Sequence, residues 1–508
     1  MSRFHLFIKR KWHGVLLLTA VLFLTGWVVW LNLPLSVVIA ESLAAPLEST
    51  ANSSGLLCRY GVNLIQPEQN LKFSDLQAGW YMDYKALATP AVSTGANYTV
   101  NVRLTQVGAD DYTYSLNDPG KTIQDVANGN PGAMWLIGNE PDRRDFQDDL
   151  EPHVYAKAYH DLYAQVKAAD SSARVYAGTI VQPTPLRLQY LDMVLGSYIN
   201  TYGSSMPVDG WSIHNFILNE VSCNYDPTNC WGAEIPPGMT ANYGEIIAID
   251  DNDNINIFKQ RIVDFRTWMK SRGYRHLPLT VSEYGVLMPS DFGFPVSRVN
   301  QFMTDTFDYM RTATDPNLGD PNDGYRLVQT WSWYSTGNAG DPYNGYLFDE
   351  GSIPWDLSAM GTHYRDYVNA RPDEVDFFPS GITHTPATLI SSGQPVTMTL
   401  RSRIANSGNL VTASGPAVVR FYDGDPAFGG QQIGTDQMVT LAGCGLNMET
   451  AVTWSNVSTG THTVYVAVDP GGFIPEIDET NNVISQTVLV GTHAISLPVI
   501  TRQIDLTP

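Results

Sequence analysis

The feature that most constrains this chain is a repeated alternation of short apolar segments with amphipathic helical segments. Eight strand candidates occur between residues 59 and 334, and helical patterns separate the later ones. Several of the strand candidates are continuous β-branched or aromatic runs, which is typical of strands buried on both faces of a parallel sheet. Strands and helices alternating over roughly 310 residues predict an α/β fold of the (β/α)8 or TIM-barrel type.

The predicted strands cover 59–65, 79–84, 98–104, 134–140, 174–181, 209–216, 279–286 and 326–334. The predicted helices cover 152–169, 188–200, 257–272, 299–313 and 360–370. No clear helical pattern separates the first three strands. We therefore expect one barrel over 57–372 whose first part departs from regular strand–helix alternation.

The pattern changes near residue 376, where short alternating strands separated by Gly, Asn and Asp turns replace the helical period. Such a pattern predicts an all-β, immunoglobulin-like sandwich. We place this sandwich at 376–492. A C-terminal tail follows at 493–508, and its apolar stretch predicts one more short strand.

The first 40 residues predict export of the chain. Basic residues between Arg3 and Lys11 precede an apolar run from Val15 to Trp30, and Val38-Ile39-Ala40 offers a small-residue cleavage site. The apolar stretch is also long enough to span a bilayer, which takes about 20 residues. Residues 1–40 are thus either a cleaved signal peptide or an uncleaved anchor helix, and 41–56 is a linker. Both alternatives predict a secreted or extracellular protein, with a membrane tether in the second.

Composition excludes several classes of partner. The net charge of −21 disfavours nucleic acid, because an acidic surface repels phosphate backbones. The 12 Trp and 26 Tyr suit either a large core or a surface that stacks on sugars. No glycine-rich phosphate-binding pattern occurs in a strand–helix context, and no CxxC pair suggests a zinc site. We therefore expect no cofactor and no metal.

The four cysteines fit an oxidising compartment. Cys223 and Cys230 lie seven residues apart in a polar stretch, which predicts a small loop disulfide. Cys58 and Cys444 are far apart in the sequence, and whether they pair stays open at this point.

Two acidic residues end predicted strands. Glu140 closes the fourth strand and Glu283 lies at the end of the seventh. A carboxylate there is half buried and costly unless it has a function, although a solvated rim carboxylate or a helix N-cap is the alternative. Catalytic side chains of TIM barrels come from the carboxyl ends of strands. Two carboxyl groups are also the machinery of glycoside hydrolysis, where one protonates the leaving oxygen and the other attacks or activates water.

With these residues the barrel resembles the clan A glycoside hydrolases over roughly residues 58–370. Asn139-Glu140 within GNEPD matches the Asn-Glu pair that this clan carries after strand four, and Glu283 within SEYG matches its nucleophile after strand seven. The resemblance implies that Glu140 is the acid/base, that Glu283 is the nucleophile and that Asn139 bonds the sugar 2-hydroxyl. These roles require a raised pKa for Glu140 and an ionised Glu283.

Six further residues at or near strand ends are candidates for substrate binding: His214, Asn215, Trp333, Arg103, Asn63 and Asp83. His214 would orient the nucleophile or bond the substrate, and a capped loop histidine is the alternative. By the resemblance, Trp333 rather than Trp331 would form a sugar-stacking floor. Arg103 would keep Glu283 ionised or would form an ordinary core salt bridge. Tyr284 is expected to pack on the other side of its strand.

The C-terminal region resembles the bacterial CARDB β-sandwich. The stretches Phe421-Tyr422-Asp423-Gly424 and Glu479-Thr480-Asn481-Asn482 carry the resemblance. It implies a prokaryotic surface or secreted protein in which this domain has an accessory role in adhesion or spacing.

Together these features predict a retaining glycoside hydrolase that cleaves β-linked polysaccharides or oligosaccharides. The alternative is a non-catalytic carbohydrate-binding or adhesion protein of the cell surface. The identity of the sugar and endo versus exo action stay open.

Overall fold

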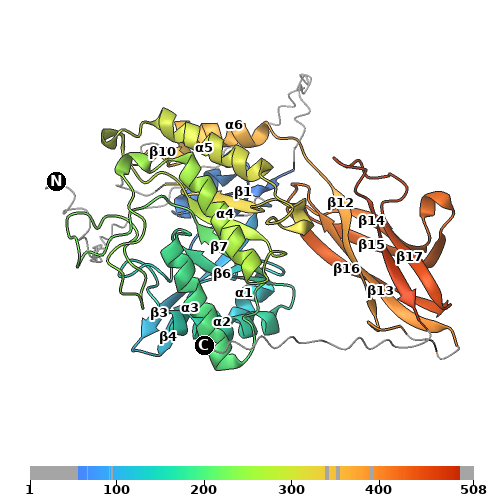
Figure 1. The fold of residues 1–508 in the computed structure, drawn as a ribbon. Helices are drawn as coiled ribbons and strands as arrows, with labels where there is room; N and C mark the ends of the chain where they lie inside the picture. Colours follow the sequence, from blue (N-terminus) through green and yellow to red (C-terminus); the bar gives the residue numbers. More distant parts are fainter. Residues whose placement is uncertain are drawn as a thin grey trace, which may run out of the picture. The chain divides into compact units, whose positions relative to one another are not determined.

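A computed structural model describes residues 55–65, 67–90, 92, 95–337, 343–349, 355–389, 391 and 394–491. Its first half is a closed barrel of eight parallel strands (Figure 1). The strands are β1 (Leu57–Asn63), β2 (Ala78–Met82), β3 (Asn97–Val107), β5 (Met134–Ile137), β6 (Arg174–Ile180), β7 (Gly210–His214), β8 (Leu279–Tyr284) and β9 (Thr330–Trp333). They follow one another around the ring, and pairing of β2 with β3 and of β9 with β1 closes it. The TIM barrel expected from the sequence is confirmed.

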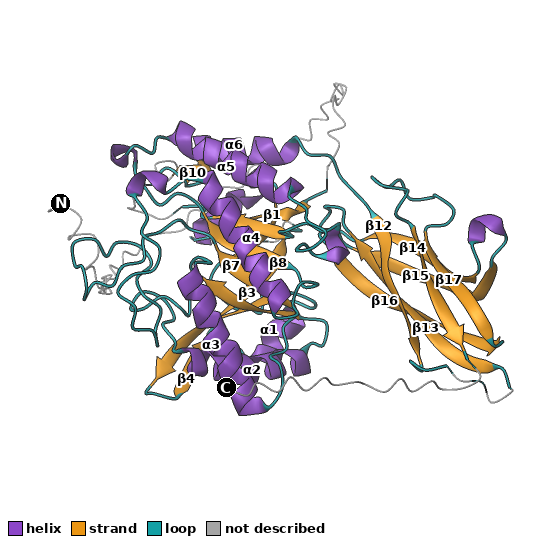
Figure 2. Cartoon of the chain, viewed as in Figure 1, coloured by secondary structure: helices purple, strands orange, loops and turns teal. Residues whose placement is uncertain are grey.

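Helices cover the outside of the ring and connect its later strands (Figure 2). They are α1 (Ile123–Gly129), α2 (Pro152–Ala169), α3 (Pro185–Tyr202), α4 (Ile255–Ser271), α5 (Val296–Thr312) and α6 (Ala359–Asn369). The early barrel is irregular, as the weak helical pattern indicated. A 3-10 helix η2 (Pro67–Leu76) lies between β1 and β2, and β3 continues into a hairpin with β4 (Asp111–Ser115).

Short elements complete the barrel half. They are the 3-10 helices η3 (Ile249–Asp251), η4 (Ser290–Phe292) and η5 (Pro321–Asp323), and the two-residue strands β10 (Phe348–Asp349) and β11 (Asp356–Leu357).

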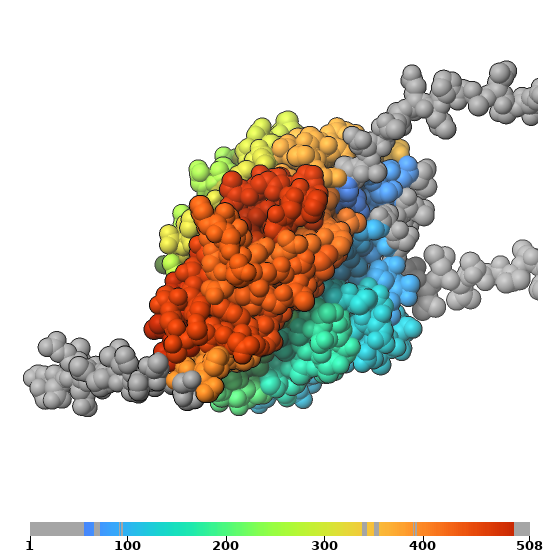
Figure 3. Space-filling view, turned by 90° about the vertical axis from the view of Figure 1, so that its right-hand side faces the viewer, coloured from blue at the N-terminus to red at the C-terminus, as the bar shows by residue number. Residues whose placement is uncertain are grey.

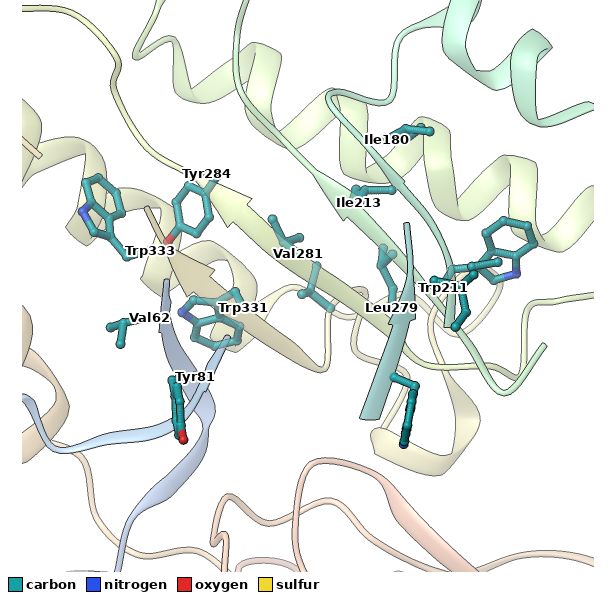
Figure 4. Close-up of a cluster of buried hydrophobic side chains, with 14 of the residues drawn as sticks. Val62, Tyr81, Ile180, Trp211, Ile213, Leu279, Val281, Tyr284, Trp331 and Trp333 are labelled. Atoms are coloured by element: carbon teal, nitrogen blue, oxygen red, sulfur yellow. The ribbon is translucent and has the colours of Figure 1, made fainter. Parts of the chain in front are cut away.

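The strands bury side chains on both faces, because helices cover the outside and other side chains fill the inside. Figure 4 shows part of the outer layer, where Trp211, Tyr284, Trp331 and Trp333 lie among aliphatic side chains. A separate cluster contains Met82, Met134, Leu136 and Tyr176. Burial on both faces explains why these strands read as continuous apolar runs.

The C-terminal region from Phe377 to Val490 is a β-sandwich of two antiparallel sheets. One sheet has the order β12 (Phe377–Thr385), β13 (Val396–Asn406), β16 (Leu446–Val457). The other has the order β15 (Gln431–Leu441), β14 (Ser414–Asp423), β17 (Gly460–Val468), β18 (Val483–Val490), and the 3-10 helix η6 (Pro426–Phe428) follows β14. The all-β architecture expected here is confirmed. Figure 3 shows the surface of these strands in orange to red.

A disulfide and hydrogen bonds join the first barrel strand to the sandwich. Cys58 forms a disulfide with Cys444 at a sequence separation of 386. Beside it, the buried guanidinium of Arg59 donates to both carboxylate oxygens of Asp323 at 2.9 Å and to the carbonyl oxygen of Ser407 at 2.8 Å. The pairing of Cys58 and Cys444 that the sequence left open is thus present in the structure.

The predicted signal peptide or anchor at 1–40 and the predicted C-terminal tail strand lie outside the described residues. Among the residues described, none of the helices combines the length and the apolar character needed to cross a bilayer.

We expect the long-range disulfide to contribute more to stability than the local one. Replacing Cys58 and Cys444 by Ser opens a loop of 386 residues and should lower the free energy of unfolding by about 5 kcal/mol, because long loops lose the most entropy on closure. Replacing Cys223 and Cys230 opens a loop of seven residues and should cost about 2 kcal/mol. Denaturant titrations of both double variants measure the difference, and an equal or reversed order would contradict it.

Candidate functional site

Glu140 and Glu283 meet at the carboxyl ends of the barrel strands. Glu283 is the next-to-last residue of β8, whereas Glu140 lies three residues beyond the end of β5. Glu140 has φ 46°, in the left-handed region that is strained for a residue with a side chain, and its backbone N–H donates to the carbonyl oxygen of Thr179. Glu140 and Glu283 are 2% and 4% exposed, respectively. One carboxylate oxygen of Glu140 lies within 4.8 Å of one carboxylate oxygen of Glu283.

His214 lies between the two carboxyl groups. It is the last residue of β7, and its ring is completely buried. Nδ1 is 3.0 Å from Glu140 Oε1 in hydrogen-bond geometry. Nε2 is 3.2 Å from Glu283 Oε1, an ion-pair contact without hydrogen-bond alignment. One ring therefore holds both glutamates, which favours the orienting role expected for His214.

The charges of the free site oppose the expectation from the sequence. Burial favours the protonated form of Glu140, but the Arg143 charge and the His214 hydrogen bond outweigh it and lower the pKa of Glu140 to about 2. Burial raises the pKa of Glu283 to about 7. The charge of His214 opposes this increase, and the charge of Glu140 adds to it. The pKa of His214 is raised, because both carboxylates offset its burial. The neighbouring charges thus lower the pKa of Glu140 and raise the pKa of Glu283, which is the opposite of the order that the acid/base and nucleophile roles require.

Arg143 is the cation that holds Glu140 in this state. Its Nη1 lies 3.1 Å from Glu140 Oε2, and its Nη2 donates to the carbonyl oxygen of Gly232 at 3.3 Å. The guanidinium also lies 5.3 Å from the centroid of the Phe146 ring. Arg143 is not among the residues expected from the sequence, although it follows Glu140 by only three residues.

A buried ion network supports the segment behind Glu140. Arg187 of α3 forms ion pairs with Asp142 and, at 2.6 Å, with Glu220, and all three side chains are buried. Its remaining donors bond the carbonyl oxygens of Ala233 and Glu234. Since an unpaired charge in this position would cost several kcal/mol, the network fixes the loops after β5 and β7 relative to each other.

Three predicted binding residues lie close to the carboxylates. Arg103 of β3 pairs with Asp148 at 2.7 Å, and its charge also lowers the pKa of Glu283. The structure thus contains the salt bridge that was one alternative for Arg103, whereas its charge does not offset the raised pKa of Glu283. Asn139 and Asn63 are buried, and the Oδ1 atom of each accepts no hydrogen bond from any described residue.

Three other residues that were predicted to bind substrate point away from the carboxylates, and these predictions are corrected here. Trp333 is 0% exposed, packs edge-on against Tyr284 and donates its indole N–H to Gly345 (Figure 4). Asp83 accepts from the Tyr98 hydroxyl at 2.9 Å, and Asn215 donates to the carbonyl oxygen of Phe258 on α4. The reason is strand alternation, since the neighbouring side chain faces the site in each case.

The residues that do face the site are aromatic. Tyr84 packs on the cluster that contains Met82, and the charge of Glu283 contributes to a raised Tyr84 pKa that burial dominates. Tyr334 packs edge-on against Phe216, which in turn contacts the His214 ring, and half-buried Trp231 joins this cluster. Tyr334 follows Trp333 directly, so the alternation of side chains along the strand directs it to the opposite face.

Cys223 and Cys230 form a disulfide in the loop that leads to Trp231. All four cysteines are thus paired.

Glu140, His214 and Glu283 are also close enough to share a metal ion. Their oxygen and nitrogen atoms already contact one another and Arg143, whose charge would repel a cation. We therefore assign none of them as a metal ligand.

This fold and site define a TIM barrel with a histidine-bridged pair of glutamates at its carboxyl rim, followed by a β-sandwich. The CARDB family model matches residues 381–486, so the C-terminal region carries a CARDB domain and the resemblance seen in the sequence is confirmed. A search of curated proteins finds no match.

Solved structures similar to this chain include glycoside hydrolases. A GH128 (subgroup II) endo-β-1,3-glucanase from Pseudomonas viridiflava is 12% identical, with 61% of this chain and 97% of that chain covered and a TM-score of 0.37. A monomeric β-xylosidase from Caulobacter crescentus is 11% identical, with 80% and 98% covered and a TM-score of 0.38. A CARDB domain from Pyrococcus furiosus is 17% identical, with 24% and 96% covered and a TM-score of 0.19. At such scores these similarities add no evidence about substrate or mechanism.

We expect Glu283→Gln to stabilise the protein, and the gain should grow with pH. The folded-state pKa of the Glu283 carboxyl, about 7, exceeds its ordinary value of 4.5. Between pH 4.5 and pH 7 the unfolded chain loses a proton that the folded chain keeps, so the free energy of unfolding falls as the pH rises. The amide removes this loss, giving a gain from near zero at low pH to about 3 kcal/mol above pH 7. Unfolding by urea across this range measures the gain. Glu449→Gln, which alters an exposed carboxylate, is the control, and a pH-independent difference for Glu283→Gln would contradict the expectation.

Proposed function

We propose that this protein is a retaining glycoside hydrolase that cleaves β-linked polysaccharides or oligosaccharides. The observation that carries the proposal is the approach of Glu140 and Glu283 to within 4.8 Å at the carboxyl rim of the barrel. Retaining enzymes hold their two carboxyl groups about 5–5.5 Å apart, whereas inverting enzymes leave about 6.5–9.5 Å for a water molecule. The short separation supports the retaining alternative.

In the proposed first step, Glu283 attacks the anomeric carbon of the bound sugar. The glycosidic carbon–oxygen bond breaks as Glu140 donates a proton to the leaving oxygen, and a covalent glycosyl–enzyme ester forms on Glu283. In the second step Glu140, now a carboxylate, takes a proton from water, which attacks the anomeric carbon and releases Glu283. Two inversions at the same carbon give net retention.

The neighbours of the pair are suited to hold a sugar. The unpaired Oδ1 of Asn139 is an acceptor for the 2-hydroxyl, in line with the role implied by the clan A resemblance. Tyr334 and Trp231 offer half-buried aromatic faces on which a pyranose ring packs. We propose this aromatic cluster, in place of Trp333, as the sugar-stacking surface.

We further propose that the barrel at 57–372 is the catalytic domain and that the CARDB sandwich at 376–492 is an accessory surface domain. Two disulfides that pair all four cysteines support an extracellular location, because such bonds persist in oxidising compartments. The two domains would together act on glycans outside the cell.

We expect Glu283→Ala to reduce turnover of a β-linked glycan by about 10⁴-fold or more, because the covalent step loses its nucleophile. The glycan is first found by screening soluble β-glucans, mannans, xylans and galactans with residues 41–508. With an aryl glycoside of the same sugar, azide should restore turnover of Glu283→Ala and give a glycosyl azide of inverted configuration. Nuclear magnetic resonance of the product reads that configuration.

Glu140→Ala is the matched variant, because it lacks the acid/base but keeps the nucleophile. Azide should rescue it with retained configuration. Unchanged turnover by Glu283→Ala would exclude the mechanism. Glycan binding by the wild-type protein without any hydrolysis would favour the alternative of a carbohydrate-binding protein.

A further inference from the structure

Both carboxylate oxygens of Glu140 are engaged in the structure. His214 Nδ1 contacts Oε1 at 3.0 Å, and Arg143 Nη1 contacts Oε2 at 3.1 Å. A general acid must carry a proton on one oxygen and direct it at the leaving oxygen of the substrate. The positive charge of Arg143 beside Oε2 stabilises the carboxylate and disfavours the protonated acid. The contact with Arg143 therefore has to weaken before Glu140 acts as an acid.

The contact with His214 is the fixed one. The His214 ring is completely buried at the end of β7, and its second nitrogen contacts Glu283. Moving this ring would leave both carboxyl groups without their shared neighbour. Oε1 of Glu140 therefore stays with His214.

The contact with Arg143 is the one that can open. Arg143 lies on the loop after β5, and its side chain is 22% exposed. Apart from Glu140, its guanidinium has a long hydrogen bond of 3.3 Å to Gly232 and a contact with Phe146, whose ring is itself 48% exposed. A guanidinium at the edge of solvent can exchange these partners for the hydroxyl oxygens of a sugar.

The other charges around Glu140 come from elements that are held in place. His214 faces it from β7, Glu283 from β8 and the Tyr84 hydroxyl from the segment after β2. Behind it, Asp142 is neutralised by the buried Arg187 of α3. Among these described groups, Arg143 is the cation at the partly exposed side of Glu140.

We propose that Arg143 is a positioning residue that keeps Glu140 unprotonated in the free protein and leaves Oε2 when the leaving-group sugar enters. Oε2 then takes up a proton from solvent water, which Glu140 donates to the leaving oxygen, and the freed guanidinium bonds hydroxyl groups of the leaving-group sugar. Arg143 thus marks the leaving-group side of the site. The inference rests on the proposed glycosidase function, and it links acid activation to occupancy of that side.

The resting contact is tested without any substrate. In protein labelled with ¹³C at glutamate carboxyl carbons, the Glu140 signal is assigned by its loss in Glu140→Gln and followed against pH. In Arg143→Gln the midpoint of the Glu140 titration should rise by at least about one pH unit, because the nearest cation is gone. Arg144→Gln is the matched control, since the Arg144 guanidinium bonds the carbonyl oxygen of Pro236 and not Glu140. An unchanged midpoint in Arg143→Gln would overturn the proposal.

The release of Arg143 is tested by binding. The slow variant Glu283→Gln is saturated with unbranched β-linked tetrasaccharides of glucose, mannose, xylose or galactose. Binding should raise the Glu140 midpoint in this variant and should leave it unchanged when Arg143→Gln is added. An unchanged Glu140 midpoint in the Glu283→Gln variant after saturation would show that Arg143 stays in place and would overturn the release step.

Failure of the proposed function has a different signature. If none of these glycans binds or is hydrolysed, the glycosidase proposal fails and the release step fails with it. The titration of the free protein still decides whether Arg143 controls the ionisation of Glu140.

Discussion

The closure of eight parallel strands into one ring is the constraint on which the rest of this structure depends. Because β2 pairs with β3 and β9 with β1, all eight carboxyl ends meet at one rim. Residues that are more than 140 positions apart in the sequence, such as Glu140 and Glu283, are thereby brought within 4.8 Å. The apolar layers inside and outside the ring make this arrangement rigid enough to keep charged groups buried.

Buried charge at that rim is tolerated because each group has a partner. His214 touches both glutamates, Arg143 neutralises one of them, and Arg187 ties down the loop that follows. The cost remains visible at Glu283, which lacks an aligned hydrogen bond on Oε1 and has a raised pKa. A site that stores unfavourable electrostatics of this kind is typical of catalysis rather than of simple structural packing.

The sequence was sufficient for the strands and for the residues that end them. Glu283 and His214 were found because each ends a short apolar run, and the ring was counted correctly although its first helices are irregular. Trp333 was misplaced because a run of alternating aromatics does not reveal which phase faces inward. This difference of one position separates Trp333 from Tyr334, the residue that we propose for the sugar-stacking surface.

Arg143 and the pKa order were out of reach for a different reason. Their effect depends on how the loop after β5 folds back on Glu140, and no local pattern specifies the path of such a loop. From the sequence, the pKa values of the two glutamates could be ranked only by the roles that the clan A resemblance implies. The structure shows instead which cation lies beside which carboxylate, and this decides the charge of the resting site.

The disulfide between Cys58 and Cys444 gives the folded region an unusual connectivity. It joins the first barrel strand to the sandwich across 386 positions, so almost the whole described chain lies within one covalent loop. A single backbone cut anywhere inside that loop leaves one molecule, not two fragments. A protease that cut one surface loop would therefore leave the barrel and the sandwich covalently joined.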